Sequence, residues 1–401
     1  FSPQGDESSK RWKGLPGRDL LDPPYKIHNV QGPLSQKTIN TDLKHHNGLT
    51  QFDTHNLYGS MMSVASRDAM QARRPDKRPL VITRATFAGA GSHVSHWLGD
   101  NNSDWPHYLW TIRGMLQFAS IFQVSMVGSD VCGFGSNTTE ELCARWAMLG
   151  AFQPFYRNHN AEGNIPQEFY NWKSVTKAAK KAIDIRYRLL DYFYTALMQQ
   201  SKDGTPAVSP MLYLYPNDPK TFDLDLQYFY GPSLLVAPVT EEGARSVDVY
   251  LPDDVFYDFY THEPFTTGGK TIKKSNQGLT DIPLFLRGGV IVPMRIKSAM
   301  TTTDLRKQDF ELVIPVGKDG KAEGWLYLDD GESLHPTQSS WIHLKYASGT
   351  VRATGQFGYR SDLKIRKVTV MEGSHQGGSA HSSSRSRSAN QPLSGEFSIR
   401  V

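Results

Sequence analysis

An acidic residue, Asp100, stands at the end of a short apolar segment that also contains Trp97. The segment reads SHWLGDN at 95–101. We expect an acid at the end of a buried strand, under a Trp, to have a raised pKa, because burial disfavours the charged form of a carboxyl group. Such an acid can protonate a leaving oxygen. The alternative is an Asp that caps the following helix.

Four short apolar runs in the first half of the chain end at polar residues. The runs are 79–83, 93–98, 124–127 and 152–155, and they lead to Arg84, Asp100, Asp130 and His159. Such runs are typical of parallel strands that are buried on both faces. In a (β/α)8 barrel, active-site residues lie at the carboxyl ends of the strands. Only four such strands are visible, so we expect half of a barrel.

Helical patterns lie between and after these runs. Ser103 can cap a helix with Pro106 in its first turn. Thr138 and Glu141 match a capping box. A last, long helix is predicted from about 173 to 202, where Gly204 can end it.

After residue 204 the pattern changes to short strands between Pro, Gly and Asp turns, which suits β-sandwiches. Strands are expected near 212–214, 227–230, 233–237, 247–251, 256–260, 283–286 and 290–292, and then near 310–314, 323–328, 342–346, 365–370 and 395–401. The predicted division is a linker or surface segment at 1–50, the half barrel at 51–203, and sandwiches at 204–295 and 296–401. A low-complexity loop is expected at 373–390. Its run SRSRS could belong to a nucleic-acid-binding segment, but a mobile surface loop is favoured because the run is short and isolated.

The bulk composition excludes several classes of protein. Of the 401 residues, 38% are apolar and 21% are charged, and the net charge of +4 is too small to indicate nucleic-acid binding. No apolar run is long enough to span a bilayer. The pair His45-His46 has no further ligand at suitable spacing, so loop histidines are favoured over a metal site. The start, FSPQG, has neither Met nor an apolar signal core, so we expect the end of a trimmed or cleaved chain.

Two cysteines, Cys132 and Cys143, leave three possibilities open. In a secreted protein they would form one disulfide, which would stabilise the fold by roughly 2–3 kcal/mol. In a cytosolic protein they would be buried thiols, and a redox pair is the least favoured interpretation. A glycosylation sequon begins at Asn137, and a second at Asn101, where a glycan is not expected because that residue adjoins Asp100.

Four motifs in order carry a resemblance to a known family. They are TRATFAG (83–89), HWLGDN (96–101), GSDVCGF (128–134) and RNHN (157–160). Together they resemble glycoside hydrolase family 31, the α-glucosidases. The resemblance covers about 51 to 294, and more loosely the rest, and it implies strands five to eight of the barrel followed by two β-domains. It also favours a disulfide between the two cysteines.

The resemblance implies a role for each motif residue. Asp100 would be the general acid/base, and the substrate would be bound by Arg84, Trp97, Asp130, Phe134 and His159. An arginine offers a fixed fork of donors to hydroxyls or to a carboxylate. The aspartate can accept hydroxyl hydrogens, the histidine can donate one, and the aromatic rings can pack on sugar CH faces. The alternatives are an ion pair for the arginine, a helix cap for the aspartate and a packed ring for the histidine.

The resemblance implies a retaining, exo-acting α-glucosidase that releases glucose from maltose-like substrates, with transglucosylation as a second activity. Its nucleophile would be an Asp in a Trp-x-Asp-Met-Asn-Glu-like motif, which is absent from these 401 residues. We therefore expect a separate N-terminal chain of the same precursor to supply it, as in secreted fungal two-piece members of the family. Rival interpretations are a glycoprotein-trimming glucosidase of the endoplasmic reticulum, an α-xylosidase, or a non-catalytic carbohydrate-binding subunit. No cofactor or metal is implied.

Overall fold

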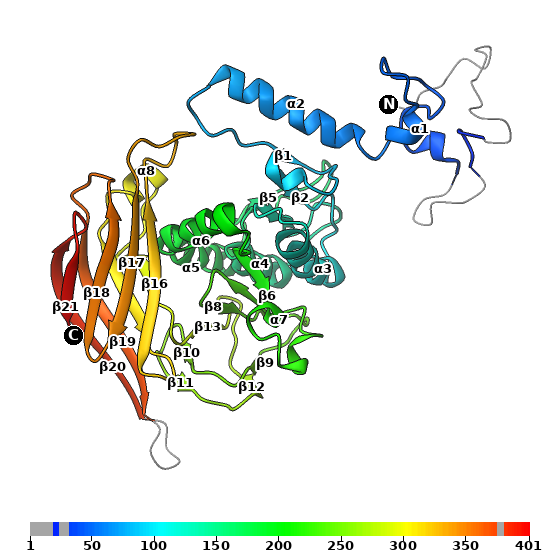
Figure 1. The fold of residues 1–401 in the computed structure, drawn as a ribbon. Coiled ribbons are helices and arrows are strands. Elements are labelled where there is room, and N and C mark those ends of the chain that lie inside the picture. Colours follow the sequence, from blue (N-terminus) through cyan, green and yellow to red (C-terminus); the bar gives the residue numbers. More distant parts are fainter. Residues whose placement is uncertain (1–18, 24–31, 375–380) are drawn as a thin grey trace.

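The structure, a computed structural model, describes residues 19–23, 32–374 and 381–401 (Figure 1). Helix α2 (Tyr58–Arg73) projects from the main body, and residues 32–54 lie at its far end. These residues include the 3-10 helix η1 (Leu34–Gln36) and helix α1 (Gln51–Thr54). The other part of the expected segment 1–50 lies outside the described residues. None of the described helices is both long and apolar enough to cross a membrane.

Short parallel strands follow α2. Strands β1 (Ile82–Thr83), β2 (Ser95–Trp97) and β3 (Val127–Gly128) form one parallel sheet, and β4 (Asp130–Val131) pairs in parallel with β5 (Arg157–Asn158). Three of the four predicted runs lead into these strands. The run 152–155 does not: it forms turns and bends after a helix, with Phe152 buried in the core, and the strand begins at Arg157.

The helices between and after these strands are η2 (Ala90–Ser92), α3 (Trp105–Leu116), the π-helical η3 (Gln117–Ile121), α4 (Glu140–Gly150), α5 (Lys173–Arg188) and α6 (Leu190–Asp203). Helices α3 and α4 pack on the strands, α5 packs on α4, and α6 packs on two later strands, β14 (Val292–Arg295) and β16 (Lys321–Leu328). Two predicted caps are wrong by one residue. Asp104, not Ser103, accepts the hydrogen bond that caps α3, and Thr139, not Thr138, caps α4. The predicted long helix is broken at Leu189, and Gly204 ends α6 in the left-handed conformation as predicted.

The region after Gly204 is rich in antiparallel strands. A six-stranded sheet has the order β11 (Pro264–Phe265), β10 (Phe256–Asp258), β13 (Leu284–Arg287), β8 (Leu234–Val236), β7 (Tyr228–Tyr230) and β6 (Val208–Pro210). Beside it, β12 (Lys270–Lys274) pairs with β9 (Val247–Leu251). The predicted strand at 212–214 is instead helix α7 (Met211–Leu214), which is followed by η4 (Pro219–Thr221).

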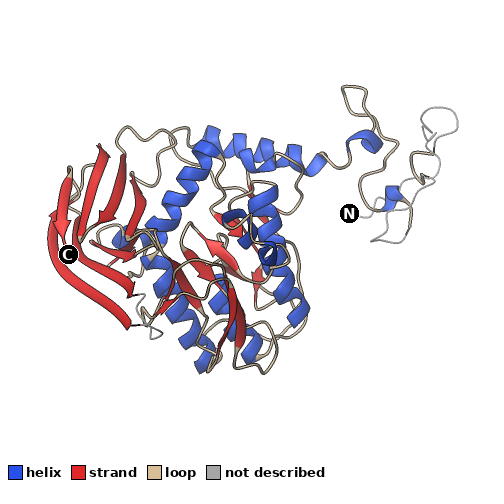
Figure 2. Cartoon of the chain, turned by 60° about the horizontal axis from the view of Figure 1, so that its bottom comes forward, coloured by secondary structure: helices blue, strands red, loops and turns tan. Residues whose placement is uncertain are grey.

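Two four-stranded sheets form the C-terminal end of the molecule, away from the N-terminal helices (Figure 2). One has the order β14 (Val292–Arg295), β15 (Phe310–Pro315), β19 (Lys364–Ser374), β20 (His381–Pro392); the other has β16 (Lys321–Leu328), β17 (Ser340–Ala347), β18 (Thr350–Phe357), β21 (Phe397–Arg400). The short helix α8 (Thr302–Leu305) lies between β14 and β15 in the chain. Buried side chains of both sheets form one hydrophobic cluster.

The low-complexity segment is not the loop that its composition predicts. From His381 onward it forms strand β20, which pairs antiparallel with β19, while 375–380 lie outside the described residues. A serine-rich segment can form a strand here because the hydrogen bonds come from backbone pairing with β19 and do not depend on the side chains. Composition alone therefore misassigned this strand.

A second hydrophobic cluster joins the parallel strands to the six-stranded sheet. It contains apolar residues of α3, α4 and α5 together with residues of β7, β8 and β13. A third, smaller cluster lies between the six-stranded sheet and β9. The strands that carry the predicted site are thus held by helices on one side and by a β-sheet beyond them.

Candidate active site

The register of the parallel strands places the predicted site residues side by side. Thr83 pairs with His96, Trp97 with Gly128, and Asp130 with Arg157. Arg84 follows directly on β1, Asp100 lies three residues beyond the end of β2, and His159 follows directly on β5. Since the carboxyl ends of parallel strands meet at one edge, residues far apart in the sequence come together here.

Asp130 is the buried carboxyl group of this site. Its side chain is inaccessible to solvent, and Arg157 Nε donates to its Oδ1 over 3.0 Å, with a second bond from the Arg157 Nη2 to the same oxygen. Burial raises the pKa of Asp130, and the Arg157 guanidinium opposes that shift. The other oxygen, Oδ2, has no hydrogen-bond partner among the described residues, so it is free to accept a hydrogen from a ligand.

Trp97 contacts two arginines of the site. The Arg157 guanidinium carbon is 4.9 Å from the centre of the Trp97 ring, and that of Arg84 is 5.8 Å from it. The indole N–H is buried near Asp130 and lowers the pKa of that carboxyl slightly, although no hydrogen bond of normal geometry joins them. The tryptophan therefore holds both guanidinium groups at the ends of the strands by cation–π contact.

Asp100 differs from the prediction in its burial. Its side chain is 49% exposed, and its Oδ2 lies 3.9 Å from Arg84 Nη1, at the outer limit of an ion pair. The expectation that Asp100 is buried under the tryptophan is therefore wrong for this chain. Before it reaches Asp100, the backbone leaves the extended conformation of β2 at Gly99, where φ is +90°. A side chain at that position is strained, and its Cβ would also lie 3.1 Å from the Arg84 side chain.

Phe134 and His159 lie on neighbouring loops, with ring centres 5.1 Å apart and planes tilted by 32°. The loop of Phe134 is held by Asn101, whose Oδ1 accepts from the Phe134 amide over 2.9 Å. The Nδ2 of Asn101 donates to the Asp130 carbonyl oxygen over 3.0 Å. Asn101 therefore ties the loop after β2 to β4.

Sequence reasoning missed two members of this group. Arg157 lies in the RNHN motif but had no assigned role, although a basic residue next to a buried Asp was a usable signal. Gln167 lies outside the motifs, and its buried Nε2 donates to the His159 carbonyl oxygen over 3.1 Å. No spacing in the sequence marked it. The structure brings all six predicted ligand-facing residues to one edge.

The neighbouring His96 is structural. It is buried and stacked on Phe118, with ring centres 3.8 Å apart. Burial lowers its pKa to about 4, while a hydrogen bond with the Thr83 backbone opposes the shift. A neutral imidazole in the core thus packs against η3 and supports β2.

The disulfide implied by the resemblance is formed between Cys132 and Cys143. It joins the loop after β4 to α4 and so anchors the segment that carries Asp130. Asn137 is exposed, and its Oδ1 accepts from the Ile165 amide over 2.8 Å, which leaves its Nδ2 without a hydrogen bond among the described residues. In the described ranges, no group of three or more His, Cys, Asp or Glu side chains could hold a metal ion.

Comparisons with known proteins assign a family to this arrangement. The models of the glycosyl hydrolases family 31 TIM-barrel domain and of the family 31 C-terminal domain match residues 24–196 and 204–292. A probable alpha/beta-glucosidase, agdC, of Neosartorya fischeri is 57% identical over 374 residues, which cover 92% of this chain and 42% of that protein. A probable alpha-glucosidase of Oryza sativa subsp. japonica is 38% identical over a stretch that covers 85% of this chain and 39% of that protein.

Solved structures agree with this assignment. The crystal structure of an ER glucosidase II heterodimeric complex, formed by a catalytic subunit and the binding domain of a regulatory subunit, is similar with a TM-score of 0.83 and 29% identity, covering 92% of this chain and 44% of that one. A Flavobacterium johnsoniae dextranase complexed with glucose gives a TM-score of 0.73 at 27% identity, and the match covers 82% of this chain and 43% of the dextranase chain. The chain thus spans less than half the length of the relatives that it matches.

Proposed function

Because this chain belongs to glycosyl hydrolase family 31, we propose that it supplies the proton donor and the sugar-binding residues of a retaining α-glucosidase. The observation that carries the proposal is the position of Arg84, Asp100 and Asp130 beyond the carboxyl ends of the adjacent parallel strands β1, β2 and β3. The substrate would be a maltose-like α-glucoside, cleaved from its non-reducing end, with transfer of glucose to other sugars as a second outcome. The 57% identical fungal relatives are named probable alpha/beta-glucosidases, which supports a glucoside, and the 38% identical rice relative is named a probable alpha-glucosidase, which supports the α-linkage.

In this proposal each residue acts through the geometry described above. Asp100 is open to the solvent side and can reach a glycosidic oxygen, protonate it as the bond breaks, and later take a proton from water. Asp130 offers its unpaired Oδ2 to a sugar hydroxyl, while Arg157 holds its other oxygen in place. Phe134 and Trp97 supply apolar surfaces, and His159 is placed to bond another hydroxyl.

A retaining mechanism needs a second carboxylate roughly 5–5.5 Å from the first, which attacks the anomeric carbon. Asp130 does not suit that role, because it is fully buried and its Oδ1 is held by Arg157. We propose that the nucleophile lies on a separate N-terminal chain of the same precursor. The greater length of the relatives and the absence of the nucleophile motif in this sequence support this.

The described strands and helices offer surfaces for such a partner. The 51–203 region has five short parallel strands, of which β3 and β4 are separated by a single residue. Counting β3 and β4 as one, we propose that they are strands five to eight of a barrel that the partner closes. Beyond β1 and β5, no further strand of the described residues continues the parallel sheets. Large apolar side chains are exposed on α2 and beside β1, namely Tyr58, Met61, Met62, Leu80 and Phe87. A completing half barrel would cover such surfaces.

The finer division of the chain belongs to the same proposal: a surface segment at 1–50, and β-sandwich domains at 204–295 and 296–401. We also propose a secreted protein with a glycan on Asn137, which the disulfide and the exposure of that residue support. Because an ER glucosidase II is among the similar structures, glycans of glycoproteins are a rival class of substrate. Trimmed glycans and xylosides therefore belong in the substrate panel beside maltose.

The test is the variant Asp100→Asn in the assembled enzyme. We expect turnover of an aryl α-glucoside to fall by about 10²–10⁴-fold, the usual contribution of general acid–base catalysis. The exposed Asp223→Asn serves as the matched control and should leave turnover unchanged. Equal turnover in Asp100→Asn and the wild type would refute the role.

Denaturing mass spectrometry of the purified active enzyme tests the partner. We expect the 45.0 kDa polypeptide together with a second polypeptide that contains the nucleophile motif. Full activity in a sample that contains the 45.0 kDa chain alone would contradict the two-chain proposal. Activity of one longer chain that includes the motif would contradict separation into two pieces, while leaving the role of Asp100 to the variant above.

A further inference from the structure

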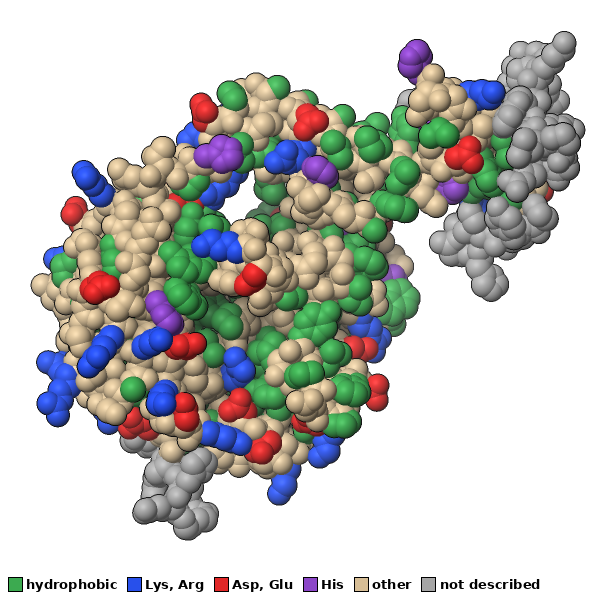
Figure 3. Space-filling model, in the orientation of Figure 1, with side chains coloured by type: hydrophobic (Ala, Val, Ile, Leu, Met, Phe, Trp, Pro, Cys, Tyr) green, Lys and Arg blue, Asp and Glu red, His purple; other side chains and the backbone are tan. Residues whose placement is uncertain are grey.

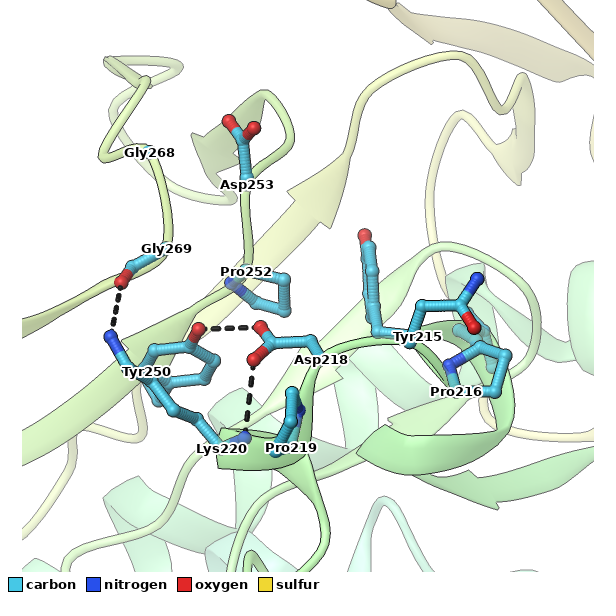
Figure 4. Close-up of a pocket in the computed structure, with 12 residues that line it drawn as sticks. Tyr215, Pro216, Asp218, Pro219, Lys220, Tyr250, Pro252, Asp253, Gly268 and Gly269 are labelled. Carbon is cyan, nitrogen blue, oxygen red and sulfur yellow. Dashed lines mark hydrogen bonds between the residues drawn. The ribbon is translucent and has the colours of Figure 1, made fainter.

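Two hollows of the described surface lie away from the ends of the parallel strands. The first, of about 460 Å³, is lined by Asp218, Lys220, Tyr250 and Gly269 among others (Figure 4). Its polar groups bond to one another: the Tyr250 hydroxyl donates to Asp218, and Lys220 Nζ donates to the Gly269 carbonyl oxygen over 3.1 Å. These groups are already satisfied, so this hollow offers little to a ligand.

The second hollow is larger, about 620 Å³, and is bounded by α6, by the turn between β7 and β8, and by β16. Figure 3 shows the molecule hollowed between its C-terminal sheets and the rest, with hydrophobic side chains along the walls. The volume falls within the range of about 300–1,000 Å³ that is usual for small-molecule sites. It shares no lining residue with the candidate active site.

An aromatic residue, Trp325, lines this second hollow. Because side chains alternate along β16, Glu323 and Trp325 lie on the face opposite to the buried Ala322 and Leu326. The Trp325 ring is stacked on His343, with ring centres 4.0 Å apart and planes only 4° from parallel. The stacking fixes the orientation of the indole, yet Trp325 remains 38% exposed. A large apolar ring of fixed orientation thus lines an open cavity.

Polar groups of both signs accompany the ring. Arg287 lines the cavity, has no salt bridge among the described residues, and its buried Nε has no hydrogen-bond partner there. A buried polar atom without a partner calls for an explanation, and a bound ligand is one. Glu323 lines the same cavity and is exposed, with a contact of 3.4 Å to His343. One positive and one negative group favour a ligand without net charge.

The walls of this cavity are rigid, which suits a preformed site. The Thr195 hydroxyl of α6 accepts from the Tyr327 amide of β16 over 2.9 Å and so ties the two elements together. The Ile291 amide donates to the Glu323 carbonyl oxygen over 2.9 Å. A Cβ on Gly324 would lie 2.4 Å from the Ile291 carbonyl oxygen, so the close approach of these backbones requires glycine.

We propose that this cavity is a second carbohydrate-binding site that takes a neutral oligosaccharide, such as a short α-linked glucose chain. A flat ring can pack on the CH face of a sugar, while a guanidinium group donates to hydroxyl oxygens and a carboxylate accepts hydroxyl hydrogens. The ring is already oriented, so binding loses little side-chain entropy. The site would hold a chain without cleaving it, and it does not depend on the proposed hydrolytic function.

The experiment is calorimetric titration of the chain with maltopentaose. It is carried out in an Asp130→Asn background, in which we expect weaker sugar binding at the ends of the parallel strands, since Asp130 is proposed to bind a sugar hydroxyl there. We expect binding to survive in that background and to weaken at least tenfold when Trp325→Ala is added. Phe222→Ala, which removes another exposed aromatic ring that lines neither hollow, should leave binding unchanged. Trp325→Phe should retain most of the affinity.

Binding that is unaffected by Trp325→Ala would overturn the inference, as would the absence of any binding in the Asp130→Asn background. Should Trp325→Ala fail to fold by circular dichroism, the exposed Glu323→Ala takes its place and should weaken binding several-fold. No weakening with that folded variant counts against the site. Turnover of an aryl α-glucoside by the assembled enzyme is measured separately. If turnover fails but binding still depends on Trp325, the hydrolytic proposal falls and the second site stands.

Discussion

The ion pair between Arg157 and Asp130 offers the sharpest quantitative test of the candidate site. The variant Arg157→Met keeps a long apolar side chain but leaves a fully buried carboxyl group without its charged partner. Removal of one partner of a buried pair costs about 3–5 kcal/mol. The Arg157 side chain is 38% exposed, so water screens part of this interaction, and we expect a loss of about 2–4 kcal/mol in the free energy of unfolding at pH 7.

The chain contains a matched control. Arg113 is 39% exposed and pairs with Asp225 over 2.6 Å, but Asp225 is 50% exposed. Surface pairs of this kind contribute about 0–1 kcal/mol, so Arg113→Met should have little effect. The two variants remove the same group at the same exposure and differ in the burial of the partner. Urea unfolding followed by tryptophan fluorescence gives both values.

The pH dependence has a definite sign. Burial raises the pKa of Asp130 above its ordinary value, so the folded state binds the proton more tightly than the unfolded state. Ionisation of Asp130 therefore lowers stability as the pH rises through the window between the two pKa values. Without Arg157 the pKa rises further, and the difference between variant and wild type should grow from about pH 4 toward neutrality. A loss no larger than that of Arg113→Met, or one independent of pH, would refute the reasoning.

Three further changes test the frame around the site. Replacing Cys132 and Cys143 by Ser should lower the free energy of unfolding by about 2–3 kcal/mol, and reduction of the wild type should reproduce the shift in urea midpoint. Gly128→Ala would place a Cβ 1.9 Å from a backbone carbonyl oxygen, so it should cost about 1–3 kcal/mol. Gly395→Ala has open space and should cost far less in the same assay; equal losses would argue against the packing. Asn137→Gln should remove one glycan from protein secreted by a eukaryotic host, seen as a drop in mass, and an unchanged mass would exclude glycosylation there.

The sequence by itself predicted which residues form the candidate site. Four motifs, each at the end of an apolar run, pointed to Arg84, Asp100, Asp130 and His159, and the parallel register brings them together. The period of the apolar residues also distinguished the helical and parallel first half from the strand-rich second half. The change of pattern at Gly204 was visible for the same reason, since a glycine in the left-handed conformation ends α6.

Only the tertiary structure decided the environment of each carboxyl group. Sequence reasoning expected Asp100 to be buried, yet it is half exposed, and the fully buried carboxyl is Asp130. Burial depends on which elements cover a side chain, and those elements lie far away in the chain. The same applies to strand β20. Its serine-rich composition predicts a loop, but in the folded chain it pairs with β19, which supplies its backbone hydrogen bonds. Local residue type fixes what a group can do, and long-range packing fixes its solvent exposure and its partners.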